Sequence, residues 1–257
     1  MAFEVRLERR GRVAIITIDN PPVNALHPDV ADAISARAAV VGDDREVRAL
    51  ILTGAGKHFM AGGDIEFFKT LNRASAERYV LGVQEMQDDL ATLPQPVIAA
   101  LNGTTLGGGC ELAMACDIRI AEAHIVLGQP EVTLGLIPGA GGTQALPRLV
   151  GLGRAKRMLF TGERVTAEAA LAMGLVDEVV PKGTGLDRAI ELGETIAANA
   201  PLAVTAAKRA VTLGMQMSLL DANRLEATLF ASLAETYDLD EGVRAFYDKR
   251  APVFESR

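Results

Sequence analysis

The chain has 257 residues, of which 49% are hydrophobic and 23% charged, so it suits one large folded domain or one domain with an appendage and argues against disorder. Acidic residues outnumber basic ones by 33 to 26, and the net charge of −7 disfavours a nucleic-acid or anionic-membrane surface. The charged start has no apolar signal-peptide stretch, and no window reaches the ~18 apolar residues of a membrane span. We therefore expect neither a nucleic-acid nor a membrane partner.

The cysteine and histidine content excludes several kinds of site. Cys110 and Cys116 lie six residues apart in a helix-like run that a disulfide would break, which favours a reducing, cytoplasmic location. The three histidines form no HExxH motif, so no metal site is expected. Neither GxSxG nor GxxxxGK[ST] occurs, which removes the α/β-hydrolase and P-loop classes.

Short strands and helices alternate in the first half of the chain. Two β-branched runs, 3–9 and 12–18, flank Arg10-Gly11 and predict a hairpin. Further strands are expected over 49–53, 96–101, 117–121 and 125–127. Helices are expected over 28–41, from about 64, over 74–93 and from the glycines at 107–109. The repeated order of strand, strand and helix predicts a mixed α/β core.

The second half is predicted to be mostly helical. Its expected helices cover 143–149, 152–160, 166–173, 185–199, 202–217, 221–236 and 240–248, with one strand over 176–180. The last helices are rich in Ala and Leu and are apolar on more than one face. That pattern fits packing on a partner subunit and packing on the chain's own core equally well.

Three glycine-containing segments stand out as candidates for chemistry: 59–64, 102–112 and 128–143. A glycine run between a strand and a helix leaves backbone N–H groups without partners at the positive end of the helix, which suits a phosphate or a developing oxyanion. A tight turn is the simpler explanation for a single glycine, but not for three in a row. The spacing GxGxxG is absent, which disfavours dinucleotide binding.

Three carboxylates adjoin these glycines. Glu111 follows the triple glycine inside an apolar run, where a surface charge at a helix start and a half-buried functional acid are equally consistent with the pattern. Glu131 follows Pro130 and by itself reads as a helix-start charge. Asp64 reads as a helix N-cap. Together, Glu111 and Glu131 beside a donor-rich loop suggest general acid–base catalysis by a pair of carboxyl groups.

At this point the sequence resembles the crotonase superfamily and is most similar to its enoyl-CoA hydratases. The similarity extends through the whole chain, and the order and spacing of several short motifs carry it. These motifs are NPPVNAL at 20–26, AGGD at 61–64, NGTTLGGGCELA at 102–113, GQPEVTLGLIPGAGGTQ at 128–144, FTGERVTAEAALAMGLVDEVV at 160–180 and EGVRAFYDKRAPVF at 241–254.

The resemblance implies an α/β fold, a crotonase-like spiral of ββα units with a C-terminal helical oligomerisation region. The spiral core, with the CoA site and the active site, would span 1–195, and the helical trimerisation region 196–257. A homotrimer or a dimer of trimers is the assembly it implies.

The resemblance also implies a reaction, the hydration of 2-enoyl-CoA thioesters in fatty-acid metabolism. Backbone N–H groups of Gly63 and Gly108 would form an oxyanion hole, with Glu111 mainly activating water and Glu131 mainly delivering the α-proton. The residues implied in binding CoA are Lys57, Ala61, Gly62, Asp64, Ile65 and Lys249. No cofactor is needed, because CoA is part of the substrate. An enoyl-CoA isomerase or a specialised acyl-CoA dehydratase is the alternative, since these enzymes share the oxyanion hole.

Overall fold

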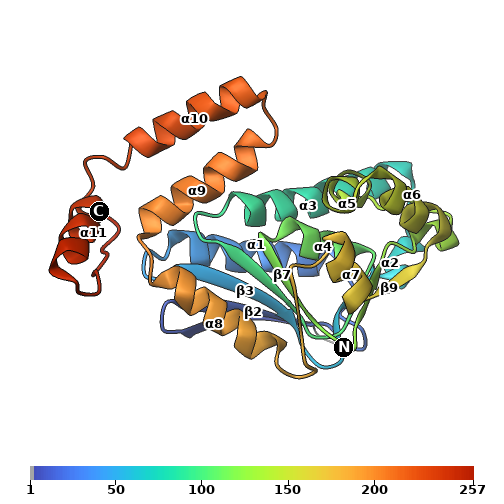
Figure 1. Cartoon of the computed structure of the whole chain (residues 1–257). Helices are drawn as coiled ribbons and strands as arrows, with labels where there is room; N and C mark the ends of the chain where they lie inside the picture. Colours follow the sequence, from blue (N-terminus) through green and yellow to red (C-terminus); the bar gives the residue numbers. More distant parts are fainter. Residues whose placement is uncertain (1–2) are drawn as a thin grey trace.

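Two β-sheets form the centre of the structure, a computed structural model that describes residues 3–257 (Figure 1). The larger sheet contains, in spatial order, β1 (Glu4–Arg10), β2 (Val13–Asp19), β3 (Ala49–Gly54), β5 (Val97–Leu101), β7 (Ile118–Glu122) and β10 (Glu178–Val180). The smaller sheet contains β4 (His58–Ala61), β6 (Thr104–Leu106), β8 (Val126–Gly128) and β9 (Arg164–Thr166).

The chain winds between the two sheets as a spiral. The pairs β3–β4, β5–β6 and β7–β8 each place their first strand in the larger sheet and their second in the smaller one. Within each sheet these strands run parallel, whereas β1 and β2 form the predicted antiparallel hairpin. Helical segments follow each pair, which confirms the expected repeat of strand, strand and helix.

The helices of the first 200 residues are α1 (Pro28–Asp43), α2 (Ile65–Phe68), α3 (Arg73–Thr92), α4 (Gly108–Ala115), the 3-10 helix η1 (Glu131–Leu134), α5 (Gly142–Val150), α6 (Leu152–Thr161), α7 (Ala167–Met173) and α8 (Gly185–Ala197). They cover both faces of the larger sheet, with α8 on one face and α1 on the other (Figure 1). Val13 and Ile15 of β2 pack in the cluster that includes Ala189 of α8, and Ala14 and Ile16 pack in the cluster under α1. Burial on both faces explains why this strand is apolar without alternation.

Three short strands differ from the prediction. The expected strands do not include the segment 58–61, where the structure forms β4, nor the segments of β6 and β9. Each has only three or four residues, too few to show a period of two, and glycines flank β4 and β6. These strands exist because the neighbouring strands of the smaller sheet supply their hydrogen-bond partners.

The C-terminal helices extend away from the sheets (Figure 1). They are α9 (Pro201–Gly214), α10 (Leu219–Ala231) and α11 (Tyr237–Asp248). Within the described chain, no residue of α9 or α10 is buried. Large apolar side chains are exposed along this region, among them Val211, Met215, Leu219, Phe230 and Phe246. The boundary between residues 195 and 196, which would separate the spiral core from the helical region, stays a prediction. Helix α8 packs on the larger sheet and ends at Ala197, two residues after that boundary.

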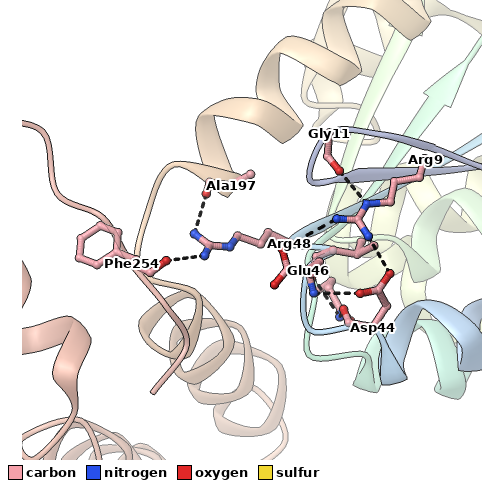
Figure 2. A network of polar contacts seen from close by, with 9 residues as sticks. Arg9, Gly11, Asp44, Glu46, Arg48, Ala197 and Phe254 are labelled. Atoms are coloured by element: carbon pink, nitrogen blue, oxygen red, sulfur yellow. Dashed lines mark hydrogen bonds and ion pairs between the residues drawn. The ribbon is translucent and has the colours of Figure 1, made fainter.

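Two cations tie the C-terminal region to the sheets. Arg48 is 7% exposed and donates to the carbonyl of Ala197 at 3.1 Å and to that of Phe254 at 2.6 Å (Figure 2). Lys208 of α9 forms an ion pair with Asp117 at 2.8 Å. Both cations therefore have polar partners, and the segment around Phe254 returns to the sheets.

No helix within residues 3–257 combines the length and the apolar character needed to cross a lipid bilayer.

Candidate active site

An apolar cavity of about 180 Å³ lies between the α2–α3 segment, the start of α4 and the segment 130–140. The predicted site residues that line it are Ala61, Gly62, Gly63, Ile65, Gly108, Glu111 and Glu131. Residues from three separate parts of the sequence thus meet at one cavity, with two carboxylates as its charged side chains.

The N–H of Gly63, a residue that lines this cavity, is left free by a single β-bridge. Leu26 donates its N–H to the carbonyl of Gly62 at 2.8 Å and accepts from the N–H of Asp64 at 3.1 Å. In a trans peptide the C=O and N–H point in opposite directions, so the N–H of Gly63 points away from Leu26. Among residues 3–257 it has no acceptor, and it is therefore available to a ligand.

Gly108 supplies a second amide beside the first. It is the first residue of α4, and its N–H has no acceptor in the described chain, as is usual at a helix start. A Cβ at this position would lie 3.9 Å from the nitrogen of Gly63. Gly109 permits this approach, because a Cβ there would overlap the carbonyl of Met60 in β4.

Gly107 turns the chain from β6 into α4 with φ of +52°, a conformation that L side chains rarely adopt. A Cβ here would lie 2.7 Å from Oε1 of Glu131. The glycine run therefore does more than form a tight turn: it lets the carboxylate of Glu131 approach the backbone next to Gly108.

Glu111 is held by two backbone amides. It lies in the first turn of α4, is 5% exposed, and its Oε1 accepts from Ala140 and Gly142, each at 2.8 Å. Its Oε2 has no hydrogen-bond partner among the described residues. Burial raises the pKa of Glu111, and the two amides oppose that rise. The structure thus decides between the two interpretations of Glu111 in favour of the buried acid.

Glu131 is the first residue of η1, directly after Pro130. Its pKa is raised to about 7: burial is the largest cause, its own backbone amide opposes the rise, and the charge of Glu111 adds to it. A carboxyl group with a pKa near neutrality can both donate and accept a proton at physiological pH. The interpretation of Glu131 as a plain helix-start charge is therefore incomplete.

Gln129 is a site residue that the sequence analysis missed. It is fully buried, and in the amide orientation that satisfies its neighbours Nε2 donates to Oε1 of Glu131 at 3.0 Å and to Oε2 at 3.2 Å. Its place in the motif GQPEVTLGLIPGAGGTQ, directly before Pro130 and Glu131, was the available signal.

Tyr79 of α3 was also missed. It lines the cavity, and its hydroxyl donates at 3.1 Å to the carbonyl of Leu26, the residue that orients Gly63. Its ring packs against those of Phe67 and Phe68, with centroids 5.4 and 5.6 Å apart. No local pattern marks Tyr79, because its role depends on how α3 packs over the loop.

Three predicted CoA-binding residues do not line the cavity. Asp64 caps α2, its Oδ1 accepting from Glu66 at 2.9 Å and Phe67 at 3.1 Å, as its N-cap interpretation predicts. Lys57 lies between β3 and β4, and Lys249 follows α11, which lies at the opposite end of the molecule from α2 (Figure 1). A role for any of the three in binding CoA stays a prediction.

The described residues contain no group of three or more His, Cys, Asp or Glu side chains placed to hold a metal ion. The arrangement instead combines two free amides with two acids. Amides of this kind can stabilise negative charge on a carbonyl oxygen, and carboxyl groups beside them can transfer protons to and from neighbouring atoms. The fold and site define a class of enzyme that acts on an activated carbonyl compound.

Comparison with known proteins places the chain within that class. The family model described as enoyl-CoA hydratase/isomerase matches residues 8–257. A short-chain-enoyl-CoA hydratase of Clostridium acetobutylicum is 43% identical over 96% of this chain and 95% of its own length. A crotonyl-CoA hydratase of Syntrophomonas wolfei is 42% identical over the full length of both. The chain belongs to the enoyl-CoA hydratase/isomerase family.

A solved structure agrees with the sequence relatives. The crystal structure of an enoyl-CoA hydratase from Bacillus anthracis superimposes with a TM-score of 0.95 at 39% identity, covering 98% of this chain and 99% of the other. The expected crotonase-like α/β fold is thereby confirmed.

Proposed function

We propose that the protein adds water to 2-enoyl-CoA thioesters and forms 3-hydroxyacyl-CoA. The observation that carries this proposal is that the free amides of Gly63 and Gly108 and the carboxyl groups of Glu111 and Glu131 belong to one apolar cavity. The names of the two relatives support a short acyl chain, such as crotonyl.

In the proposed mechanism the thioester oxygen accepts hydrogen bonds from both amides. Glu111 takes a proton from water through Oε2 while the water oxygen attacks Cβ, and the displaced electron pair moves to the thioester oxygen. The two amides at that oxygen lower the activation free energy by several kcal/mol, about 3 kcal/mol for each donor. The enolate then collapses as Glu131 gives its proton to Cα, so that Glu111 ends protonated and Glu131 ends ionised.

The reaction is tested with purified protein and crotonyl-CoA. Hydration removes the absorbance of the conjugated enoyl group and adds the mass of one water to the thioester. An isomerase would instead convert a 3-enoyl-CoA and leave the mass unchanged. Conversion of 3-enoyl-CoA with no loss of crotonyl-CoA would contradict the proposed hydration and favour the isomerase alternative.

The pH dependence of kcat/KM follows from the two protonation states that hydration needs. Glu131 must be protonated and Glu111 ionised, so kcat/KM falls as pH rises through the pKa of Glu131, about 7. Because the charge of Glu111 contributes to that pKa, the alkaline side of the profile gives an apparent pKa of the coupled pair Glu111 and Glu131. Initial rates from about pH 5 to about pH 9 are expected to approach a tenfold loss per pH unit on the alkaline side. A flat alkaline side would remove Glu131 from the role of acid.

The CoA-binding and assembly expectations form part of the same proposal. The exposed apolar residues of α9 and α10 support a homotrimer or a dimer of trimers, in which Lys249 of one copy would reach a neighbouring CoA site. Light scattering is expected to give three or six times the 27.2 kDa of one chain. A mass equal to that of one chain would contradict the proposed trimer or dimer of trimers.

The proposal requires no metal or redox cofactor, since each step is a proton transfer or a nucleophilic addition. It also includes a reducing, cytoplasmic compartment, which the free and buried thiols of Cys110 and Cys116 support.

A further inference from the structure

The peptide that joins Gly139 to Ala140 is held from both sides. On one side, the N–H of Ala140 donates to Oε1 of Glu111 at 2.8 Å. On the other, the carbonyl of Gly139 accepts from Nε2 of Gln84 in α3 at 2.7 Å. Because the C=O and N–H of one trans peptide point in opposite directions, a donor that fixes the carbonyl also fixes the direction of the N–H.

Helix α3 contacts this peptide at two points one turn apart. Val80 packs closely against Gly139: a Cβ built on Gly139 would lie 2.8 Å from Cγ2 of Val80. Gln84 is four residues further along α3 and therefore on the same face of the helix. The packing of α3 thus sets the position of Gly139, and the amide of Gln84 sets the orientation of the peptide that follows.

We propose that Gln84 is a positioning residue for Glu111, acting through the peptide between Gly139 and Ala140. This inference rests on the proposed function, in which Glu111 takes the proton from water. Without the donor at position 84, the glycine at 139 permits the peptide to rotate. Glu111 then loses one of the two amides that fix Oε1 and keep Oε2 directed toward the substrate.

Loss of that amide also changes the charge balance around Glu111. The Ala140 amide lowers the pKa of Glu111 against the effect of burial, so its loss raises that pKa. The titratable groups that face Glu111 are Glu131, Tyr79 and Cys110. None of them is a cation that would replace the lost donor. The acid limb of kcat/KM, where Glu111 must be ionised, is therefore expected to move to higher pH.

Gln87 offers a matched control on the same helix. Its Oε1 lies 3.5 Å from the position of a Cβ at Gly141, so it faces the same loop, yet its Nε2 has no partner among residues 3–257. Gln87→Met therefore removes an amide of the same kind without removing a hydrogen bond. It is expected to leave kcat and the pH profile as in the wild type.

The test compares Gln84→Met, Gln84→Glu and Gln87→Met with crotonyl-CoA as substrate. Gln84→Met removes the donor without adding a charge, so both its kcat and its acid limb are read. Gln84→Glu keeps a polar side chain of the same size should the Met variant fail to fold, and it is read by kcat at neutral pH, where its ionised carboxylate has no proton to donate. We expect kcat to fall about 5- to 10-fold at either, the effect of one hydrogen bond, with KM unchanged and with the acid limb raised in Gln84→Met. Circular dichroism and thermal unfolding check the fold.

The outcomes separate this inference from the proposed function. A wild-type protein without hydratase activity would refute the proposed function itself. If the wild type is active and the folded Gln84 variants keep its kcat and its acid limb, the role of Gln84 is overturned and the proposed function stands. Equal losses at Gln84 and Gln87 would also overturn it, because they would show a general effect of α3 packing.

Discussion

Replacing either acid by its amide, Glu131→Gln or Glu111→Gln, is expected to lower kcat for crotonyl-CoA hydration at least about 100-fold. Glutamine keeps the size of the side chain and much of its hydrogen bonding but cannot exchange a proton. Because the two acids act on one substrate in one reaction, the double variant is expected to lose much less than the product of the single effects. Steady-state rates with crotonyl-CoA measure all three variants.

Glu122→Gln is the matched control for these variants. Glu122 is 4% exposed and, like Glu111, accepts from two backbone amides, those of Gly183 at 2.8 Å and Gly185 at 3.2 Å. It does not line the cavity. The control is expected to lower the melting temperature and leave kcat unchanged. Near-wild-type rates in Glu111→Gln or Glu131→Gln would remove that residue from the mechanism.

The substitution Gly108→Pro is expected to lower kcat by about 100- to 1000-fold, the effect of deleting one oxyanion donor. Proline has no backbone N–H, and the first position of a helix is where it is best tolerated. Gly108 occupies that position in α4. The variant therefore removes the donor while helix α4 is expected to remain, which circular dichroism checks.

Gly108→Ala separates the missing donor from the added bulk. Its Cβ would lie 3.0 Å from Cδ2 of Leu26, so that side chain must shift by a few tenths of an ångström, but the N–H is kept. We expect a modest loss of activity in the alanine variant. Similar kcat values in the proline and alanine variants would show that the amide of Gly108 does not bind the reacting oxygen.

Long elements of this fold are predictable from the sequence, and short ones are not. Strand β2 and helix α3 each repeat their pattern often enough to show a period, and the predicted ranges agree with the structure to within two residues. Strand β4 has four residues and no such pattern. It forms because β6 pairs with it, and such pairing depends on segments far apart in the chain.

The candidate site shows the same limit at the level of single residues. The sequence indicates Glu111 and Glu131 because they adjoin glycines at helix starts, but it leaves the burial of Glu111 open. The contacts that bury and orient it come from Ala140 and Gly142, about thirty residues later. Gln84 and Tyr79 have no local signal, because each acts on the backbone of another segment.

The sequence by itself determined the alternation of strands and helices, the glycine run before α4 and the motifs that the family shares. These features are local, so the periodicity and spacing of neighbouring residues record them. Only the tertiary structure decided which N–H groups face the cavity, which carboxylate is buried and what holds each in place. Those properties depend on contacts between a peptide of one segment and a side chain of another. The packing of the spiral brings such segments together, and no local sequence pattern records it.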